Sequence, residues 1–379
     1  MRWLPSIALL AACSKLMVPS YVTTADVDNA IAKGNYEVAC VGLKMKSDEL
    51  RTHTAQQLAI VPDETANACI CEALEGRDPL EGYERKWDKA VAEGLRGSDR
   101  DEVVGCLAAM VERENLPDRA EALGILARTK APVTRTTLVK LATSPGDVAI
   151  RAAALRAMNG DKNQKDTLTA LATKDSEPKI RAAAAAALGG LAAADESVAT
   201  LLEGLATSDA EGEVRAEALA SMRQSKSKAS SALACKMMMD DPAAQVRGNA
   251  VLSFRGTKDP DELACLRKRA MAEEEDAQVR QAILDAIKSS PTKESGQILC
   301  DAIPFWLKTY LDRGLPEQIP GTDIIRAQND RDWDASFGCV QKALKASGGY
   351  SCYAKQYAGT WFQELGGTAF IPKCPPAGM

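Results

Sequence analysis

Aromatic residues and histidine are scarce in this sequence. Aromatic side chains make up 4% of its 379 residues, and His53 is the one histidine. An all-β fold draws on aromatic and β-branched residues, so this composition argues against a sandwich or a barrel. An H-E-x-x-H zinc site and a histidine-rich di-iron site each need more than one histidine, so both are excluded. A Ser-His-Asp site would depend on His53, and no G-x-S-x-G segment accompanies it.

Other signals of common protein classes are missing as well. No stretch of about 20 apolar residues is present, as a membrane-spanning helix would require. No long basic run occurs and the formal net charge is -5, so nucleic acid is not expected as a partner. Neither G-x-x-x-x-G-K-[ST] nor G-x-G-x-x-G is found, which gives no support for a nucleotide cofactor. We therefore predict no catalytic residues, no metal site and no cofactor.

Alanine, by contrast, supplies much of the 46% hydrophobic content. Alanine favours helices and lets them approach one another closely, so the composition predicts an all-α fold of many small helices.

The strongest signal is an internal repeat in which Val or Ile stands directly before an arginine. Five segments share it, and their arginines are Arg151, Arg181, Arg215, Arg247 and Arg280, spaced 30, 34, 32 and 33 residues apart. Apolar residues follow each arginine at positions +4 and +7, which places them on one face of a helix. An earlier apolar helix precedes each of these helices. Asp241-Pro242 and Asp259-Pro260 place a capping residue before a first-turn proline.

Weaker copies of the repeat extend toward the N-terminus. Arg119 is followed by Leu123 and Leu126, and Arg51 has a similar pattern, whereas Arg85 has Lys89 where an apolar residue is expected. The pattern therefore predicts that each unit consists of a first helix, a turn and a second helix that carries the arginine.

This repeat resembles the HEAT family, including the short HEAT-like repeats of phycobilisome lyases. The resemblance implies an α-solenoid of stacked helical hairpins over residues 36–299, with about seven to eight repeats. It also implies a structural ladder between repeats, formed by Arg119, Arg151, Arg181, Arg215, Arg247 and Arg280. Acidic residues near the start of the second helices would be the partners, namely Asp147, Glu177, Glu213 and Asp276. The unit of Arg247 has no acid at that place, although Asp240 and Asp241 lie upstream.

The N-terminal segment predicts an exported protein. One positive charge at Arg2 precedes a short apolar run that ends in Leu10-Ala11-Ala12-Cys13. This segment resembles a bacterial lipobox, which implies removal of residues 1–12 as a signal peptide and a lipid on Cys13. Residues 13–35 would then be a linker, and Ser14 would favour an outer-membrane lipoprotein that faces the periplasm. The alternative is an ordinary N-terminal helix with a buried cysteine.

Cysteine usage agrees with export. Ten cysteines remain when Cys13 is set aside: Cys40, Cys69, Cys71, Cys106, Cys235, Cys265, Cys300, Cys339, Cys352 and Cys374. So many in an oxidising compartment indicate disulfides, although buried free cysteines are the alternative. Cys69-Ile70-Cys71 is C-x-C rather than C-x-x-C, which does not favour a metal site.

Equivalent positions in successive first helices should face one another. On that ground we predict that Cys235 pairs with Cys265, since a disulfide needs Cα atoms within roughly 7 Å. We also pair Cys300 with Cys339 and Cys352 with Cys374, and expect the four N-terminal cysteines to pair among themselves.

Residues 300–379 differ from the repeats, because they hold 11 of the 17 aromatic residues and four cysteines. Trp306, Trp333, Trp361 and Phe362 are among them. We predict a Cys- and aromatic-rich helical cap that covers the open end of the array. The alternative is that these aromatic residues form a binding patch.

These patterns predict a non-catalytic scaffold that binds unidentified protein partners and touches a membrane through its lipid alone. Two alternatives remain. One is an enzyme related to the bilin lyases that share the repeat, and the other is a purely structural envelope spacer.

Overall fold

The computed structural model describes residues 22–76, 87–223, 228–290 and 292–309, together with a few residues beyond 350. Within these ranges the chain forms eighteen α-helices and two short 3-10 helices, and no strand. The prediction of an all-α fold is therefore confirmed. The chain divides into two compact units, residues 1–157 and 158–379.

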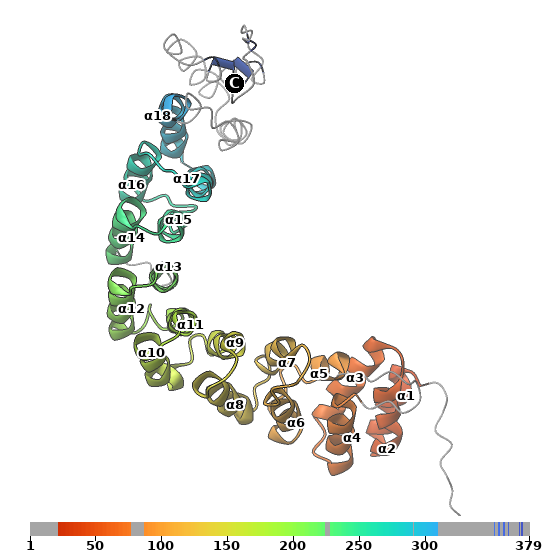
Figure 1. The fold of residues 1–379 in the computed structure, drawn as a ribbon. Helices are drawn as coiled ribbons and strands as arrows, with labels where there is room; N and C mark the ends of the chain where they lie inside the picture. The colour runs from red at the N-terminus through yellow and green to blue at the C-terminus, as the bar shows by residue number, and fades with distance from the viewer. Residues whose placement is uncertain are drawn as a thin grey trace, which may run out of the picture. The chain divides into compact units, whose positions relative to one another are not determined.

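The first unit is a two-layered stack of hairpins. One layer holds α2, α4, α6 and α8, and the other holds α1, α3, α5, α7 and α9, with neighbours in each layer packed side by side (Figure 1). The helices are α1 (Thr24–Ala32), α2 (Tyr36–Ala39), η1 (Cys40–Lys44), α3 (Asp48–Ala59), α4 (Glu64–Leu74), α5 (Lys89–Gly94), α6 (Asp101–Val111), α7 (Arg119–Leu126), α8 (Pro132–Thr143) and α9 (Val148–Ala157).

The second unit repeats this arrangement. First helices α10, α12, α14, α16 and α18 form one layer, and second helices α11, α13, α15 and α17 form the other (Figure 1). Their bounds are η2 (Lys162–Gln164), α10 (Lys165–Lys174), α11 (Pro178–Gly189), α12 (Glu196–Ser208), α13 (Gly212–Met222), α14 (Lys228–Asp240), α15 (Ala244–Leu252), α16 (Pro260–Ala270), α17 (Ala277–Ser289) and α18 (Lys293–Thr309). Stacked hairpins within each unit are the architecture of an α-solenoid.

Local chemistry sets several helix starts. The Asp259 carboxylate accepts hydrogen bonds from the N–H groups of Asp261 and Glu262, and Pro260 is the first helical residue of α16, as predicted. The parallel prediction for Asp241-Pro242 is wrong, because α15 begins at Ala244 with Ala243 as its N-cap. The Asp241 carboxylate instead accepts hydrogen bonds from Arg215.

Alanine makes close packing possible in the second unit. In α11, Ala182 is 2% exposed, while Ala183, Ala184 and Ala185 are fully buried. At the end of the same hairpin, the Gly160 N–H donates to the Ala187 carbonyl at 2.9 Å. A Cβ on Gly190 would lie 2.7 Å from the Gly160 Cα, so this turn needs glycine for its close approach.

The first helix lies inside the segment that the sequence analysis placed in a linker, residues 13–35. Thr23 and Asp26 form a capping box that starts α1, and Val27 and Ala30 are buried. A Cβ on Gly42 would come within 2.9 Å of Val27 Cγ2, which shows how closely α1 packs on the first hairpin. The segment has few apolar residues and no repeat arginine, so the periodicity that marked the other helices did not mark this one.

Gly94 offers a test of this packing. A Cβ at Gly94 in α5 would lie 2.5 Å from Ala55 Cβ and 2.6 Å from the Thr52 carbonyl oxygen of α3. We expect Gly94→Ala to lower the free energy of unfolding by about 1–3 kcal/mol, because backbone cannot move aside cheaply. Gly105→Ala is the matched control, since its Cβ would meet nothing within 4 Å in the helix α6. It should stabilise by roughly 0.5–1 kcal/mol. Urea unfolding followed by circular dichroism separates the two, and equal midpoints would contradict this account of the α3–α5 contact.

Candidate functional site

The repeat arginines of the second unit bind acids in the following hairpin. Arg181 of α11 donates from Nε and Nη2 to the two carboxylate oxygens of Asp209, each at 2.9 Å. Asp209 lies in the turn between α12 and α13, one hairpin further along the chain. The two side chains are 14% and 8% exposed, so this bidentate ion pair is largely removed from water.

The same bond recurs in the next two hairpins. Arg215 binds both oxygens of Asp241 at 2.9 Å. Arg247 binds both oxygens of Glu274 at 2.8 and 2.7 Å. Glu274 also binds the buried Arg269 of its own hairpin.

Each arginine is also fastened to its own hairpin. Nη1 of Arg215 donates to the Asp209 carbonyl at 2.9 Å, and Nη1 of Arg247 donates to the Asp241 carbonyl at 2.9 Å. The Asp209 carboxylate in turn accepts the Glu211 N–H at 3.0 Å. One acidic residue therefore shapes its own turn, holds the arginine of its own hairpin and receives the arginine of the preceding one.

These contacts shift the titration of both partners. The hydrogen bonds to Asp209 raise the pKa of Arg181, and the bonds to Asp241 and Glu274 raise the pKa of Arg215 and Arg247. Burial alone would raise the pKa of Asp209, but the hydrogen bonds from Arg181 and from the Glu211 N–H hold it below its ordinary value. Burial and the bond from Arg247 oppose each other in the same way at Glu274, with a lowered pKa as the result.

The acids that the sequence analysis assigned to this ladder are not the ones used. Asp147 and Asp276 cap the helices α9 and α17 through their own backbone N–H bonds. Glu177 is the N-cap residue of α11, and Glu213 is exposed in the first turn of α13. The true partners stand six residues before the arginine of their own hairpin, as Asp209 stands before Arg215. Asp175, Asp241 and Glu274 share this spacing, so the sequence carried the signal.

Each of the other predicted ladder arginines donates at least one hydrogen bond to a backbone oxygen. Arg119 donates from Nε to the Val111 carbonyl at 2.7 Å, and Arg151 donates from Nε to the Ala142 carbonyl at 3.1 Å. Arg280 donates from Nη1 to the Glu274 carbonyl at 2.5 Å. In each case the bond ties the second helix to the turn or helix just before it.

Arg51, a weaker copy of the repeat, forms a related bond in the first unit. Its Nη1 donates to the Met45 carbonyl at 2.6 Å, six residues earlier, as in the second unit. Its Nε lies 2.9 Å from Asp88 Oδ2, and both side chains are almost fully buried. Asp88 also caps α5 through the N–H groups of Ala90 and Val91. Arg85, which has Lys89 where the repeat has an apolar residue, lies outside the described residues.

Disulfides fasten neighbouring first helices. Cys235 of α14 is joined to Cys265 of α16, the pair that the sequence predicts, with Cα atoms 5.8 Å apart. In the first unit, Cys40 is joined to Cys69 and Cys71 to Cys106, with Cα separations of 5.9 and 5.5 Å. Cys69 and Cys71 are two residues apart on α4, so they point about 200° apart around the helix. One therefore reaches the preceding hairpin and the other reaches the following one.

The remaining cysteine predictions reach beyond the described ranges. Cys300 and Cys352 are both disulfide-bonded. Cys339 and Cys374, predicted as their partners, lie outside the described residues, as do Cys13, Trp333, Trp361 and Phe362. The predicted C-terminal cap falls mostly outside them as well.

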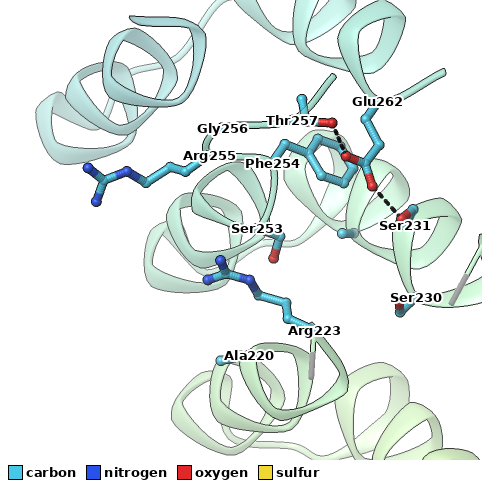
Figure 2. Close-up of a pocket in the computed structure, with 11 residues that line it drawn as sticks. Ala220, Arg223, Ser230, Ser231, Ser253, Phe254, Arg255, Gly256, Thr257 and Glu262 are labelled. Atoms are coloured by element: carbon cyan, nitrogen blue, oxygen red, sulfur yellow. Dashed lines mark hydrogen bonds between the residues drawn. The ribbon is translucent and has the colours of Figure 1, made fainter. Parts of the chain in front are cut away.

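A pocket of about 720 Å³ opens between successive hairpins of the second unit. It is lined by Arg223 at the end of α13, by residues at the start of α14, and by the loop after α15 that holds Arg255 (Figure 2). Glu262 of α16 lies at its other end. The Glu262 carboxylate accepts hydrogen bonds from Ser231, at 2.6 Å, and from Thr257.

No arrangement typical of a catalytic centre is seen in the part of the chain that the structure describes. His53 Nε2 lies 2.8 Å from Asp28 Oδ1 in a partly exposed pair between α3 and α1. Among the described residues, no group of three His, Cys, Asp or Glu side chains could hold a metal ion. No helix there is both long and apolar enough to span a bilayer. What these ranges present is a set of stacked hairpins and a polar pocket between successive hairpins of the second unit.

The ladder predicts a specific loss of stability. Asp209→Ala leaves Arg181 buried without its partner, and we expect the free energy of unfolding to fall by about 3 kcal/mol at pH 7. Because the pKa of Asp209 is lowered, its contribution is present above the ordinary carboxyl range and is lost as the pH falls below about 4. The difference between wild type and variant should therefore shrink at pH 3.

Glu213→Ala is the matched control, because this exposed acid lies one turn away and has no partner among the described residues. Its effect should stay within about 0.5 kcal/mol at both pH values. Urea unfolding at pH 7 and pH 3 makes the comparison. A Glu213 variant as unstable as the Asp209 variant would show that the ladder acid has been wrongly identified.

Comparison with known proteins agrees with the repeat. Residues 145–223 match the family model for HEAT repeats. No curated protein matches the chain.

Solved structures of several kinds match the chain at low similarity. Human deoxyhypusine hydroxylase in complex with glycerol is 15% identical over 69% of this chain and 98% of its own, with a TM-score of 0.30. A mutant of Kap121p is 13% identical over 90% of this chain and 39% of its own, with a TM-score of 0.46. The complex of CpcE and CpcF of phycocyanin lyase from Nostoc sp. PCC7120 is 18% identical over 78% of this chain and 97% of that chain, with a TM-score of 0.28.

By the match to the family model, residues 145–223 carry HEAT repeats, and the described hairpins on either side of them are also built of paired helices.

Proposed function

We propose that this protein is a non-catalytic scaffold that binds other proteins, anchored to a membrane by a lipid on Cys13 and facing the periplasm. The observation that carries the binding role is the ladder of the second unit. Because three successive arginines each bind the next hairpin, the second helices are held in a fixed order. Regular stacking of this kind creates an extended surface for a partner.

The second helices present equivalent positions along that surface. Ala220, Leu252 and Asp285 each stand five residues after a ladder arginine, and all three are half-exposed. The row presents a small, an apolar and an acidic side chain at equivalent places in successive hairpins. Thr200 lies on α12, in the layer of first helices, and is exposed.

Site-specific crosslinking tests the binding role in living cells. We expect a photo-crosslinking amino acid in place of Leu252 or Asp285 to give a discrete adduct with another protein. The same amino acid in place of Thr200 is the control and should give none. Absence of adducts from both second-helix positions, or the same adducts from Thr200, would contradict a partner surface on the second helices.

The disulfides support the proposed compartment. Eight cysteines among the described residues are disulfide-bonded, including Cys300 and Cys352. Disulfides persist in oxidising compartments and are rare in a reducing cytosol. The lipobox-like segment before Cys13 adds a reason for export, and two acyl chains would give stable anchoring.

Mass spectrometry of the protein from its native envelope tests this proposed location and the lipid anchor. We expect a lipidated Cys13 as the new N-terminus and few free thiols before reduction. An intact Met1 with free thiols throughout would overturn the anchored scaffold. It would also favour the lyase-like alternative, for which bound pigment after co-expression with bilin is the direct measurement.

A further inference from the structure

The pocket between the hairpins of α13 and α15 holds two arginines that differ from those of the ladder. Arg181, Arg215 and Arg247 each bind a carboxylate through two guanidinium nitrogens, Nε and Nη2. Arg223 and Arg255 line the pocket and have no acidic partner among the described residues. Two cations of one cavity are therefore left without a counter-charge.

The charge of Arg223 is disfavoured where it stands. Partial burial lowers its pKa, and the nearby positive charge of Arg255 lowers it further. In Figure 2 the Arg223 side chain extends toward Ser253 of the next hairpin, and both guanidiniums lie on the same side of the pocket. An anion between them would relieve both effects.

The acid of the pocket does not neutralise these arginines. Both Glu262 oxygens already accept hydroxyl hydrogen bonds, from Ser231 and Thr257 (Figure 2). Those bonds hold the carboxylate at the end of the pocket formed by α14 and α16, away from Arg223.

Helix termini explain part of the arrangement. A cation near the C-terminus of a helix is stabilised by the helix dipole, and Arg223 and Arg255 follow α13 and α15. That effect acts on each arginine separately. It does not account for two of them in one pocket, where the positive charge of Arg255 disfavours that of Arg223.

We infer that Arg223 and Arg255 form a binding site for a phosphate group, either free phosphate or a phosphate ester. Guanidinium groups match phosphate oxygens in geometry, and two cations favour a dianion over a carboxylate. Hydroxyl groups of Ser230 and Ser253 also line the pocket, and the volume of about 720 Å³ leaves room for more than one phosphate group. This site does not depend on the proposed scaffold role.

Calorimetric titration of the full chain tests the inference. Inorganic phosphate and glycerol 3-phosphate are the probes, with sodium acetate and sodium chloride as controls at equal ionic strength. We expect phosphate to bind, acetate to bind at least tenfold more weakly, and chloride to give no signal. Tighter binding of the ester than of free phosphate would identify an esterified ligand, and the reverse would identify free phosphate.

The variants Arg223→Gln and Arg255→Gln should each weaken phosphate binding at least tenfold. Arg156→Gln is the matched control, because Arg156 is an exposed arginine in the last turn of α9 and has no partner among the described residues. It should bind as wild type does. Urea midpoints equal to wild type would show that the pocket variants remain folded. Absence of phosphate binding to wild type, equal binding of acetate, or the same loss in the Arg156 variant would overturn the inference.

Discussion

The bond between an arginine of one hairpin and an acid in the turn of the next is the interaction on which the second unit depends. A single helical hairpin cannot cover its own apolar face, so its stability comes from its neighbours. Apolar packing between alanine-rich helices holds them close together but does little to fix the orientation of one helix relative to the next. The bidentate pairs from Arg181 to Asp209 and from Arg215 to Asp241 supply direction, because both forks of the guanidinium must be satisfied at once.

Two kinds of fastening act between hairpins, and they lie in different layers. The arginine pairs lie where the second helices begin, while the disulfides join first helices, as Cys235 and Cys265 do. No cysteine occurs between Cys106 and Cys235, and the pair of Arg181 with Asp209 falls within that stretch. Around α14–α16 the two kinds overlap, so both layers of that part are fixed.

Much of the fold could be predicted from the sequence, because the features that mark it recur within each repeat. The hairpins and the pairing of Cys235 with Cys265 follow from equivalent positions in successive units. The ladder acids could not be read from the residues beside each arginine, such as Glu213, because the partner of each arginine lies in the neighbouring hairpin. Asp209 also accepts the Glu211 N–H in its own turn, and its carbonyl accepts a hydrogen bond from Arg215. These two bonds explain why it stands six residues before Arg215 in the sequence. Arg223 and Arg255 could not have been singled out, because nothing in the sequence around an arginine at a helix end shows that a second arginine lines the same pocket.

The C-x-C segment of α4 changes how far the N-terminal part of the chain can be drawn out. Residues 40 and 106 are 66 positions apart in sequence, so a reduced chain between them could extend to about 230 Å. With Cys40 bonded to Cys69 and Cys71 bonded to Cys106, the covalent path between the same two residues runs through Ile70 alone. That path is roughly 20 Å long. If the chain were pulled from its ends, the force would pass through these disulfides and Ile70. The segment between Cys40 and Cys106 could then unfold without adding length to the chain.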